Sequence, residues 1–343
     1  MMEPRTLEFI AESCHGQLVT GQRTAYVNRV CTDSRLAKPG DLFVAIEGDR
    51  FDGHDYAGQA LGQGAVAALV NRSRLSLGGD VAPAIHVDET REALGQLAAR
   101  YRQDFDIPVI AVGGSNGKTT TKDILAALLG QRFETLSSEA SFNNDIGVPL
   151  TLLRLQESHR AAVIEVGSNH PGEMEALLSV VRPNIGVLTS IGREHLEFFE
   201  NLDGVLREEG ALAEALPEDG CLFVNGDIDG LETIRKRCRA RVVTIGESEG
   251  CDWRIVRITP DGEGTEFEIL SPKGDRNGVY RVNLLGRHNA HNAAIAMAVA
   301  TELGLSQEEL NQGLRDCRPA SMRMQMQTLG GVCVINDAYN SNP

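Results

Sequence analysis

The sequence lacks a paired cysteine motif, a long apolar run and an excess of positive charge. Its seven cysteines are scattered singly with no Cys-x-x-Cys spacing, which argues against a disulfide framework and favours reduced thiols. No run of about 18 apolar residues occurs, so we expect no membrane-spanning helix. The first residues lack the apolar core of a signal peptide. These absences together predict a cytoplasmic protein.

The charge balance of the chain is acidic. Lys and Arg number 33 against 48 Asp and Glu, which gives a formal net charge of −15. A nucleic-acid or membrane surface needs a basic field, so we expect neither partner. Phosphate ligands stay possible where local positive groups surround them. The length of 343 residues and a hydrophobic content of 42% predict an ordinary globular chain of two or three domains.

Residues 109–129 form the stretch around which the chain is organised. An apolar run rich in branched residues, 109–112, predicts a buried strand, and a Gly-bearing turn and a helical pattern follow it. In such a unit the turn's N–H groups and the helix N-terminus face an anion, while Lys118 adds charge and the hydroxyl of Thr119 reaches Mg²⁺. The sequence therefore predicts nucleotide binding. The predicted phosphate-binding residues are Gly114, Ser115, Asn116, Gly117, Lys118, Thr119 and Thr120.

The spacing of this turn differs from the usual G-x-x-x-x-G-K-[ST]. That pattern would need Gly at position 112, where the chain has Val112. The Gly-Lys-Thr tripeptide alone is a weak signal, so the prediction depends on the strand, turn and helix around it.

The pattern of strands and helices indicates an α/β protein. Residues 1–86 read as a small α/β module, and 87–103 as a connecting helix that begins with Thr90 as its cap. Residues 104–324 alternate strand and helix patterns, which predicts a mostly parallel sheet with helices on both faces. The segment 253–269 reads as an antiparallel hairpin. A strand begins at 332 with no strand after it, so we expect a chain that lacks most of a further domain.

Several polar residues follow predicted strands. Glu165 ends one strand beside the phosphate turn, where ligands of parallel sheets collect, and it reads as a Mg²⁺ ligand or a solvated loop residue. His195 follows another strand and is a ligand or a structural histidine. Glu208 and Glu209 lie on a predicted helix, where a solvated face is the simpler interpretation.

Two features near the end of the chain remain open from the residues alone. Asn289 and Asn292 lie three apart, hence on one helix face, and either present amides to a base edge or cap the helix. Arg323 is either a phosphate clamp or a surface cation.

Segments spread along nearly the whole chain match one family together. They lie at 32–35, 39–45, 51–55, 114–120, 142–149, 165–173, 195–197, 285–289 and 337–343. In these segments the chain resembles the Mur ligase family of peptidoglycan synthesis. The segments 51–55 and 337–343 favour the branch that joins D-alanyl-D-alanine to a UDP-N-acetylmuramoyl-tripeptide.

The resemblance implies a domain plan and an activity. It implies a UDP-sugar-binding domain over 1–86, an ATP-binding domain over 104–324 and a Rossmann-like ligase domain that starts at 325 and is largely missing. It implies an ATP-dependent, ADP-forming acid–D-amino-acid ligase that uses Mg²⁺, makes an acyl phosphate and is a soluble monomer. The alternatives are a Mur ligase that adds another amino acid, and a nucleotide- or UDP-sugar-binding module without ligase activity.

The resemblance also implies roles for individual residues. Lys118 would hold the β- and γ-phosphates, Thr119 and Glu165 one Mg²⁺, and His195 a second Mg²⁺ near the substrate carboxylate. Asn289 and Asn292 match adenine contacts, whereas Arg323 and Asp337 match ATP contacts at a hinge. The positions that match UDP-sugar contacts are Thr32, Asp33, Ser34, Arg35, Phe51, Asp52, Gly53, His54 and Asp55, and those beside the peptide substrate are Asn143 and Asn144.

One departure from the family concerns Glu209. The family has at this position a lysine that is carbamylated on its side-chain amine, which amounts to a carboxylate on a long arm. Glu209 offers the same anionic group on a shorter arm. We therefore hypothesise that Glu209 replaces the carbamate, directly or through a water, as an orienter of the second Mg²⁺, in place of the solvated-face interpretation.

Overall fold

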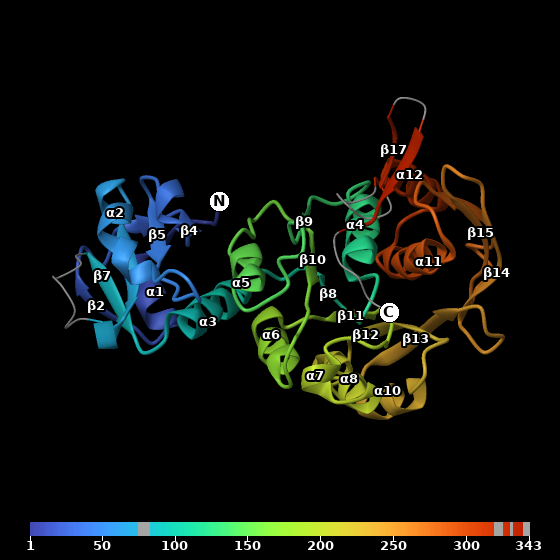
Figure 1. Ribbon diagram of the computed structural model, residues 1–343, viewed down its shortest axis with the longest axis horizontal. Helices are drawn as coiled ribbons and strands as arrows, with labels where there is room; N and C mark the ends of the chain where they lie inside the picture. Colours follow the sequence, from blue (N-terminus) through green and yellow to red (C-terminus); the bar gives the residue numbers. More distant parts are fainter. Residues whose placement is uncertain (75–82, 319–324, 330–331, 339–343) are drawn as a thin grey trace. The chain divides into compact units, whose positions relative to one another are not determined.

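The computed structural model describes residues 1–74, 83–318, 325–329 and 332–338 (Figure 1). The chain divides into two compact units, which are considered separately. Unit 1 comprises Met1–Asp106 with Asp145–Ser158, and unit 2 comprises Ile107–Asn144 with the chain from His159 onward. Within the described residues, no helix is long and apolar enough to cross a membrane.

Unit 1 is built on a five-stranded sheet of order β2-β7-β6-β5-β4. Strands β4 to β7 are parallel, and β2 joins the edge in the antiparallel sense. Its central strands are buried apolar runs because helices cover a parallel sheet. The elements of this sheet and its helices are β2 (Gln17–Thr20), β4 (Arg29–Cys31), β5 (Asp41–Val44), β6 (Ala67–Asn71), β7 (Ala84–Val87), α1 (Leu7–Ser13), η1 (Ser34–Leu36), η2 (Gly53–Tyr56) and α2 (Ala57–Gly62).

The helix predicted as a connection belongs to unit 1. Helix α3 (Thr90–Arg102) packs on α1 and on α5 (Gly147–Leu152). The hydroxyl of Tyr101 in α3 donates to the carbonyl of Leu155 at 2.6 Å. Unit 1 therefore ends at Asp106 rather than at residue 86, and it takes in a segment from the middle of the chain.

The predicted Thr90 cap of α3 is wrong. The N-cap is Glu89, whose carboxylate accepts a hydrogen bond from the N–H of Glu92 at 2.8 Å. A carboxylate can replace the hydroxyl here because a helix N-terminus favours an anionic acceptor.

Unit 2 is built on a nine-stranded sheet of order β16-β15-β14-β13-β12-β11-β8-β10-β9. The strands from β9 to β14 pair in parallel, which confirms the predicted α/β class. The antiparallel β14–β15 pair confirms the predicted hairpin. The strands are β8 (Val109–Gly113), β9 (Thr135–Ser137), β10 (Ala161–Glu165), β11 (Ile185–Leu188), β12 (Cys221–Asn225), β13 (Arg241–Gly246), β14 (Trp253–Pro260), β15 (Thr265–Leu270) and β16 (Gly278–Val282).

Helices cover both faces of this sheet (Figure 1). On one face, α11 packs against α4 and against strands β12 to β15, and its alanines let it approach closely. On the other face lie α6, α8 and α10, and α9 packs against these helices and against β11. These helices are α4 (Lys118–Leu129), α6 (Glu173–Val181), α8 (Leu202–Glu209), α9 (Ala211–Ala215), α10 (Leu231–Arg237), α11 (Arg287–Glu302) and α12 (Gln307–Asp316).

Two local features were not predicted. The strand near 332 pairs with a strand before it, because β17 (Gln325–Leu329) is antiparallel to β18 (Val332–Asn336). The predicted helix that carries Glu208 and Glu209 is α8, which ends at Glu209, and the short α9 follows after Gly210.

Candidate active site

The turn between β8 and α4 has the backbone of a phosphate cradle. Gly114 and Gly117 take φ values of +117° and +86°, in the left-handed region that favours glycine. A Cβ on Gly117 would also stand 2.6 Å from the side-chain oxygen of Asn292. Helix α4 begins with Lys118, so its first-turn N–H groups point into the turn.

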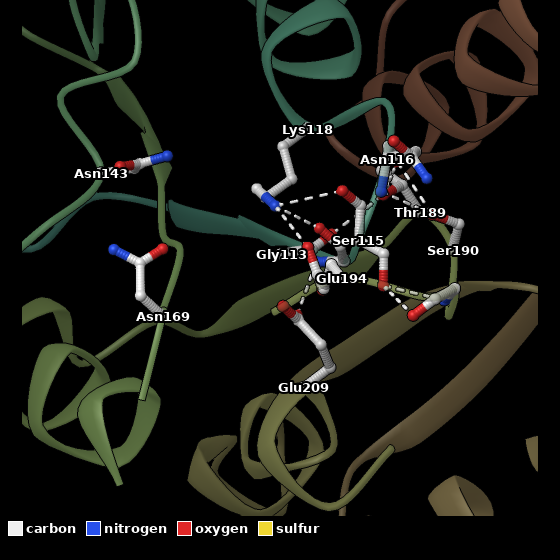
Figure 2. A network of polar contacts seen from close by, with 12 residues as sticks. Gly113, Ser115, Asn116, Lys118, Asn143, Asn169, Thr189, Ser190, Glu194 and Glu209 are labelled. Atoms are coloured by element: carbon white, nitrogen blue, oxygen red, sulfur yellow. Dashed lines mark hydrogen bonds and ion pairs between the residues drawn. The ribbon is translucent and has the colours of Figure 1, made fainter. Parts of the chain in front are cut away.

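The loop after β11 fixes the shape of this turn (Figure 2). The N–H of Ser115 donates to the carbonyl of Ser190 at 3.0 Å, and the N–H of Asn116 donates to the Ser190 hydroxyl at 2.8 Å. In return, the hydroxyl of Thr189 donates to the carbonyl of Asn116 at 2.6 Å. Thr189 and Ser190 were not predicted as site residues. Their position, at the carboxyl end of a strand that neighbours β8, was the signal that could have found them.

Lys118 is folded back onto its own turn. Its Nζ donates to the carbonyl of Gly114 at 2.5 Å and lies 3.9 Å from Oε2 of Glu194. Glu194 is buried, and its Oε1 has no hydrogen-bond partner among the described residues. Glu194 was not predicted as a site residue. It places a negative charge beside the lysine that the turn would present to phosphate.

Glu165 ends β10 beside this turn and is 1% exposed. Its Oε1 accepts a hydrogen bond from Nδ2 of Asn143 at 2.9 Å, whereas its Oε2 has no hydrogen-bond partner among the described residues. Burial raises the pKa of Glu165, and Thr119, Lys118 and Lys122 act against that rise. A buried carboxylate oxygen without a partner fits a cation, so the prediction of a ligand is chemically consistent with the structure.

Glu209 is buried directly beneath the turn, at 2% exposure. Its Oε2 accepts a hydrogen bond from the N–H of Gly114 at 2.6 Å (Figure 2). Burial raises the pKa of Glu209 to about 7, with further repulsion from Glu194 and Glu208 and an opposing effect of Lys118. The solvated-face interpretation is therefore wrong for Glu209.

Glu208 is also buried, and it is bound to a second loop. Its two carboxylate oxygens accept hydrogen bonds from the N–H groups of Gly172 and Met174, each at 2.8 Å. These N–H groups lie at the start of α6, where an anionic acceptor is favourable. The solvated-face interpretation is wrong for Glu208 too, because this carboxylate caps a helix.

His195 lies at the surface of unit 2. It is exposed, its φ is 45°, and its ring meets Phe199 edge-on at a centroid distance of 6.3 Å. Across the parts of the chain that the structure describes, no group of three or more His, Cys, Asp or Glu is arranged to hold a metal ion. The predicted metal residues Thr119, Glu165, His195 and Glu209 thus form no preassembled cage, and their metal roles stay predictions.

The two asparagines of α11 lie against the phosphate turn. Nδ2 of Asn292 donates to Oδ1 of Asn289 at 3.1 Å, and Nδ2 of Asn289 donates to the carbonyl of Leu285 at 2.8 Å. Both residues are buried. The structure therefore brings the predicted adenine-contacting pair next to Gly117.

The predicted hinge contacts are placed only in part. Asp337 is exposed after β18 and lies near His288. Burial lowers the pKa of His288, and the charge of Asp337 opposes this shift in part. Arg323 lies outside the described residues.

The loops predicted to hold the UDP-sugar follow adjacent parallel strands of unit 1. Asp33 caps η1 after β4, and its carboxylate accepts a bidentate pair of hydrogen bonds from Arg35. After β5, Nε2 of His54 accepts a hydrogen bond from the N–H of Asn71, so Nδ1 carries the proton that faces Asp52. The remaining residues of the two loops are Thr32, Ser34, Phe51, Gly53 and Asp55, at the same edge of the sheet.

Comparison with known proteins places this geometry in a family. The profile described as the Mur ligase middle domain matches residues 112–300, and that described as the Mur ligase family, catalytic domain, matches 26–102. The chain is 36% identical to the UDP-N-acetylmuramoyl-tripeptide--D-alanyl-D-alanine ligase of Bacillus subtilis (strain 168), over 100% of this chain and 74% of that relative. It is also 36% identical to the Escherichia coli (strain K12) ligase of the same name, over 98% and 74%.

Solved structures show the same likeness. A MurF crystal structure from Acinetobacter baumannii has a TM-score of 0.90 at 32% identity, over 99% of this chain and 74% of that one. The MurF ligase from Thermotoga maritima in complex with ADP has a TM-score of 0.80 at 25% identity, over 92% of this chain and 72% of that one.

Proposed function

The chain belongs to the Mur ligase family, and we propose that it is a ligase of the MurF type, which joins D-alanyl-D-alanine to a UDP-N-acetylmuramoyl-tripeptide with ATP. The single observation that carries this proposal is the agreement of nearly the whole chain with relatives of that name. The phosphate turn, with Glu165 beside it, is the local geometry that such a reaction needs.

The phosphate turn would bind ATP through three kinds of group. The first-turn N–H groups of α4 face the β- and γ-phosphates, and the ammonium of Lys118 leaves the carbonyl of Gly114 to join them. The buried pair Asn289 and Asn292 lies against Gly117, where it would meet the adenine. Asp337 and Arg323 are proposed as further ATP contacts.

Thr119 and Glu165 are the residues that would hold a first Mg²⁺. The fit rests on Oε2 of Glu165, which is buried without a partner among the described residues, and on the hydroxyl of Thr119, which lies near that carboxylate. When bound, Mg²⁺ would neutralise charge that gathers on the phosphates. His195 is proposed as a ligand of a second Mg²⁺.

Glu209 is proposed to orient this second Mg²⁺ site, directly or through a water, in the place of the family's carbamylated lysine. Its Oε2 is already occupied by the N–H of Gly114. A contact of its other oxygen with a cation would leave this hydrogen bond in place.

The proposed reaction has two steps. In the first, a carboxylate oxygen of the tripeptide attacks the γ-phosphorus, the bond between that phosphorus and the β–γ bridging oxygen breaks, and ADP leaves. In the second, the amine of D-alanyl-D-alanine attacks the acyl carbon, loses a proton and displaces phosphate. Lys118 and the turn's N–H groups stabilise the charge of the phosphoryl group in transfer.

The two units would divide the substrates. Unit 1 carries the loops 32–35 and 51–55 that are proposed to bind the UDP-sugar, and unit 2 carries the ATP site. Asn143, which donates to Glu165, and the neighbouring Asn144 are proposed to lie near the peptide. The proposed substrates would place the protein in the cytoplasm, and the family resemblance implies a soluble monomer.

The test is a ligase assay with the purified protein. UDP-N-acetylmuramoyl-tripeptide, ATP and Mg²⁺ are incubated with D-alanyl-D-alanine, meso-diaminopimelate or lysine, and ADP release and amide product are measured. Product with the dipeptide alone supports the proposal. Product with another amino acid indicates a different Mur ligase, and nucleotide binding without any product indicates a binding module.

A further inference from the structure

Lys122 is a buried cation that the proposed reaction does not use. It lies one helical turn after Lys118 in α4 and is 2% exposed. Residues four apart lie on the same face of a helix, so both lysines face the end of β10. The positive charges of both lysines oppose the rise in the pKa of Glu165.

The ammonium of Lys122 is fully satisfied. Its Nζ donates to the carbonyl of Ser138 at 2.8 Å and to the carbonyl of Ala140 at 3.3 Å, and it pairs with Oδ1 of Asp123 at 2.6 Å. An ammonium has three N–H donors, and these three acceptors match them. Lys122 therefore ties α4 to the segment that follows β9.

This segment, residues 138–143, surrounds Glu165 and is here called the collar. The hydroxyl of Ser138 accepts the N–H of Glu165 at 3.0 Å, and Nδ2 of Asn143 donates to its Oε1 at 2.9 Å. The hydroxyl of Ser141 lies 3.5 Å from that of Thr119. The collar thus occupies one oxygen of Glu165 and leaves Oε2 to face the proposed cation.

The backbone of the collar is strained at the point that Lys122 holds. Ala140 has a φ of +44°, in the left-handed region where a residue with a Cβ is disfavoured. Its carbonyl is one of the three acceptors of the ammonium. Such strain persists only when surrounding contacts determine it, and Lys122 provides such a contact.

We propose that Lys122 is a positioning residue that holds the collar around Glu165 and thereby sets which carboxylate oxygen is presented to the divalent cation of the nucleotide. This proposal rests on the proposed function, because it assigns a task to Lys122 within the same ATP site. Lys122 acts through Ser138, Ala140 and Asn143 and touches no substrate.

The test measures cation binding rather than turnover. Lys122→Met keeps the length of the side chain and removes its three donors. With the purified protein and a non-hydrolysable ATP analogue, we expect its Mn²⁺ affinity, followed by electron paramagnetic resonance, to fall about tenfold or more. Affinity for the analogue without a cation should change little. Lys118→Met, the matched control on the same helix face, should weaken binding of the analogue with and without Mn²⁺.

Two further variants keep the proposal testable if Lys122→Met folds poorly. Adding Ala140→Gly to Lys122→Met should restore part of the Mn²⁺ affinity, because glycine accepts a positive φ without strain. Asn143→Ala leaves the contacts of Lys122 in place but should weaken Mn²⁺ binding as Lys122→Met does. Unchanged Mn²⁺ affinity in Lys122→Met or Asn143→Ala overturns the proposal, as does an equal loss of cation-free nucleotide binding. Failure of the wild-type protein to bind the analogue with Mn²⁺ would instead contradict the proposed function.

Discussion

At the residue scale, the phosphate turn depends on close approaches that leave no room for a side chain. Gly117 has a positive φ, and the side-chain oxygen of Asn292 lies where a Cβ of residue 117 would stand. The hydrogen bond between Glu209 and the N–H of Gly114 fixes the other end of the turn. Nucleotide affinity and stability are therefore linked at single positions.

Gly117→Ala should lower both nucleotide binding and stability. The new Cβ must adopt a left-handed backbone and would stand 2.6 Å from Oδ1 of Asn292. We expect a loss of about 2 kcal/mol or more in the free energy of unfolding, measured by urea denaturation. Gly58→Ala in α2 is the control, since nothing lies within 4 Å of its Cβ position. It should be neutral or stabilise by less than about 1 kcal/mol. Equal losses in both variants would contradict this account.

Glu209→Gln should change how stability depends on pH in the cation-free protein. With a pKa raised to about 7, the folded chain holds this proton more tightly than the unfolded chain does. The stability that comes from the neutral carboxyl is therefore full below its unfolded pKa and is lost as the pH rises through about 7. Glutamine is neutral and still accepts the N–H of Gly114.

We therefore expect Glu209→Gln to be more stable than the wild type at pH 8, on the order of 2 kcal/mol, and to lose this advantage near pH 5. Thermal unfolding in the presence of a chelator measures it. The control is Glu218→Gln, which removes one exposed charge. A difference between Glu209→Gln and wild type that is constant from pH 5 to 8 would rule out a raised pKa.

At the element scale, α8 organises the two loops that follow β8 and β10. Its consecutive residues Glu208 and Glu209 bind the start of α6 and the phosphate turn. The strands, the parallel sheet and the phosphate turn were predictable because their signals are local: apolar runs, glycines and helical periodicity. The burial of these two glutamates could not be predicted, because the elements that cover α8 are distant in sequence. Lys122 was not found for the same reason, and Thr189 could have been found only from the pairing of β11 with β8.

Glu208→Ala should loosen the start of α6. The N–H groups of Gly172 and Met174 would lose their acceptors at a buried position, at a cost of about 2 kcal/mol. Hydrogen exchange of the first turn of α6 should speed up more than that of α4. Exposed Glu175→Ala on the same helix serves as the control and should change stability by about 0.5 kcal/mol or less. Unaltered exchange at Met174 would show that Glu208 is not the cap.

At the scale of the whole molecule, the division into two units does not follow the order of the sequence. Residues 145–158 leave unit 2 between β9 and β10 and pack in unit 1 against α3. The predicted domain boundary at residue 86 differs from the boundary of unit 1, which includes α3. The sequence shows the apolar side of this helix, but periodicity alone does not say which core that side contacts. The contacts of Tyr101 place α3 in unit 1, because its hydroxyl binds both Glu3 and Leu155.

Tyr101→Phe should weaken unit 1 selectively. The hydroxyl donates to the carbonyl of Leu155 and accepts the N–H of Glu3 at 2.7 Å, and both contacts would be lost. We expect a loss of about 1–2 kcal/mol and faster hydrogen exchange within 147–155. Tyr26→Phe, in which an exposed hydroxyl is removed, is the matched control and should have little effect. Faster exchange in β8 and β10 instead would contradict this division into units.

In the proposed reaction, the γ-phosphoryl group that Lys118 holds is transferred to a carboxylate of the substrate. The most direct measurement uses tripeptide substrate whose reacting carboxylate carries ¹⁸O, with ATP, Mg²⁺ and D-alanyl-D-alanine. Mass spectrometry then follows the label in the released phosphate. With both carboxylate oxygens labelled, we expect one ¹⁸O in each released phosphate and one ¹⁸O in the new amide carbonyl. Phosphate without ¹⁸O, formed by attack of water on ATP, would contradict the proposed reaction.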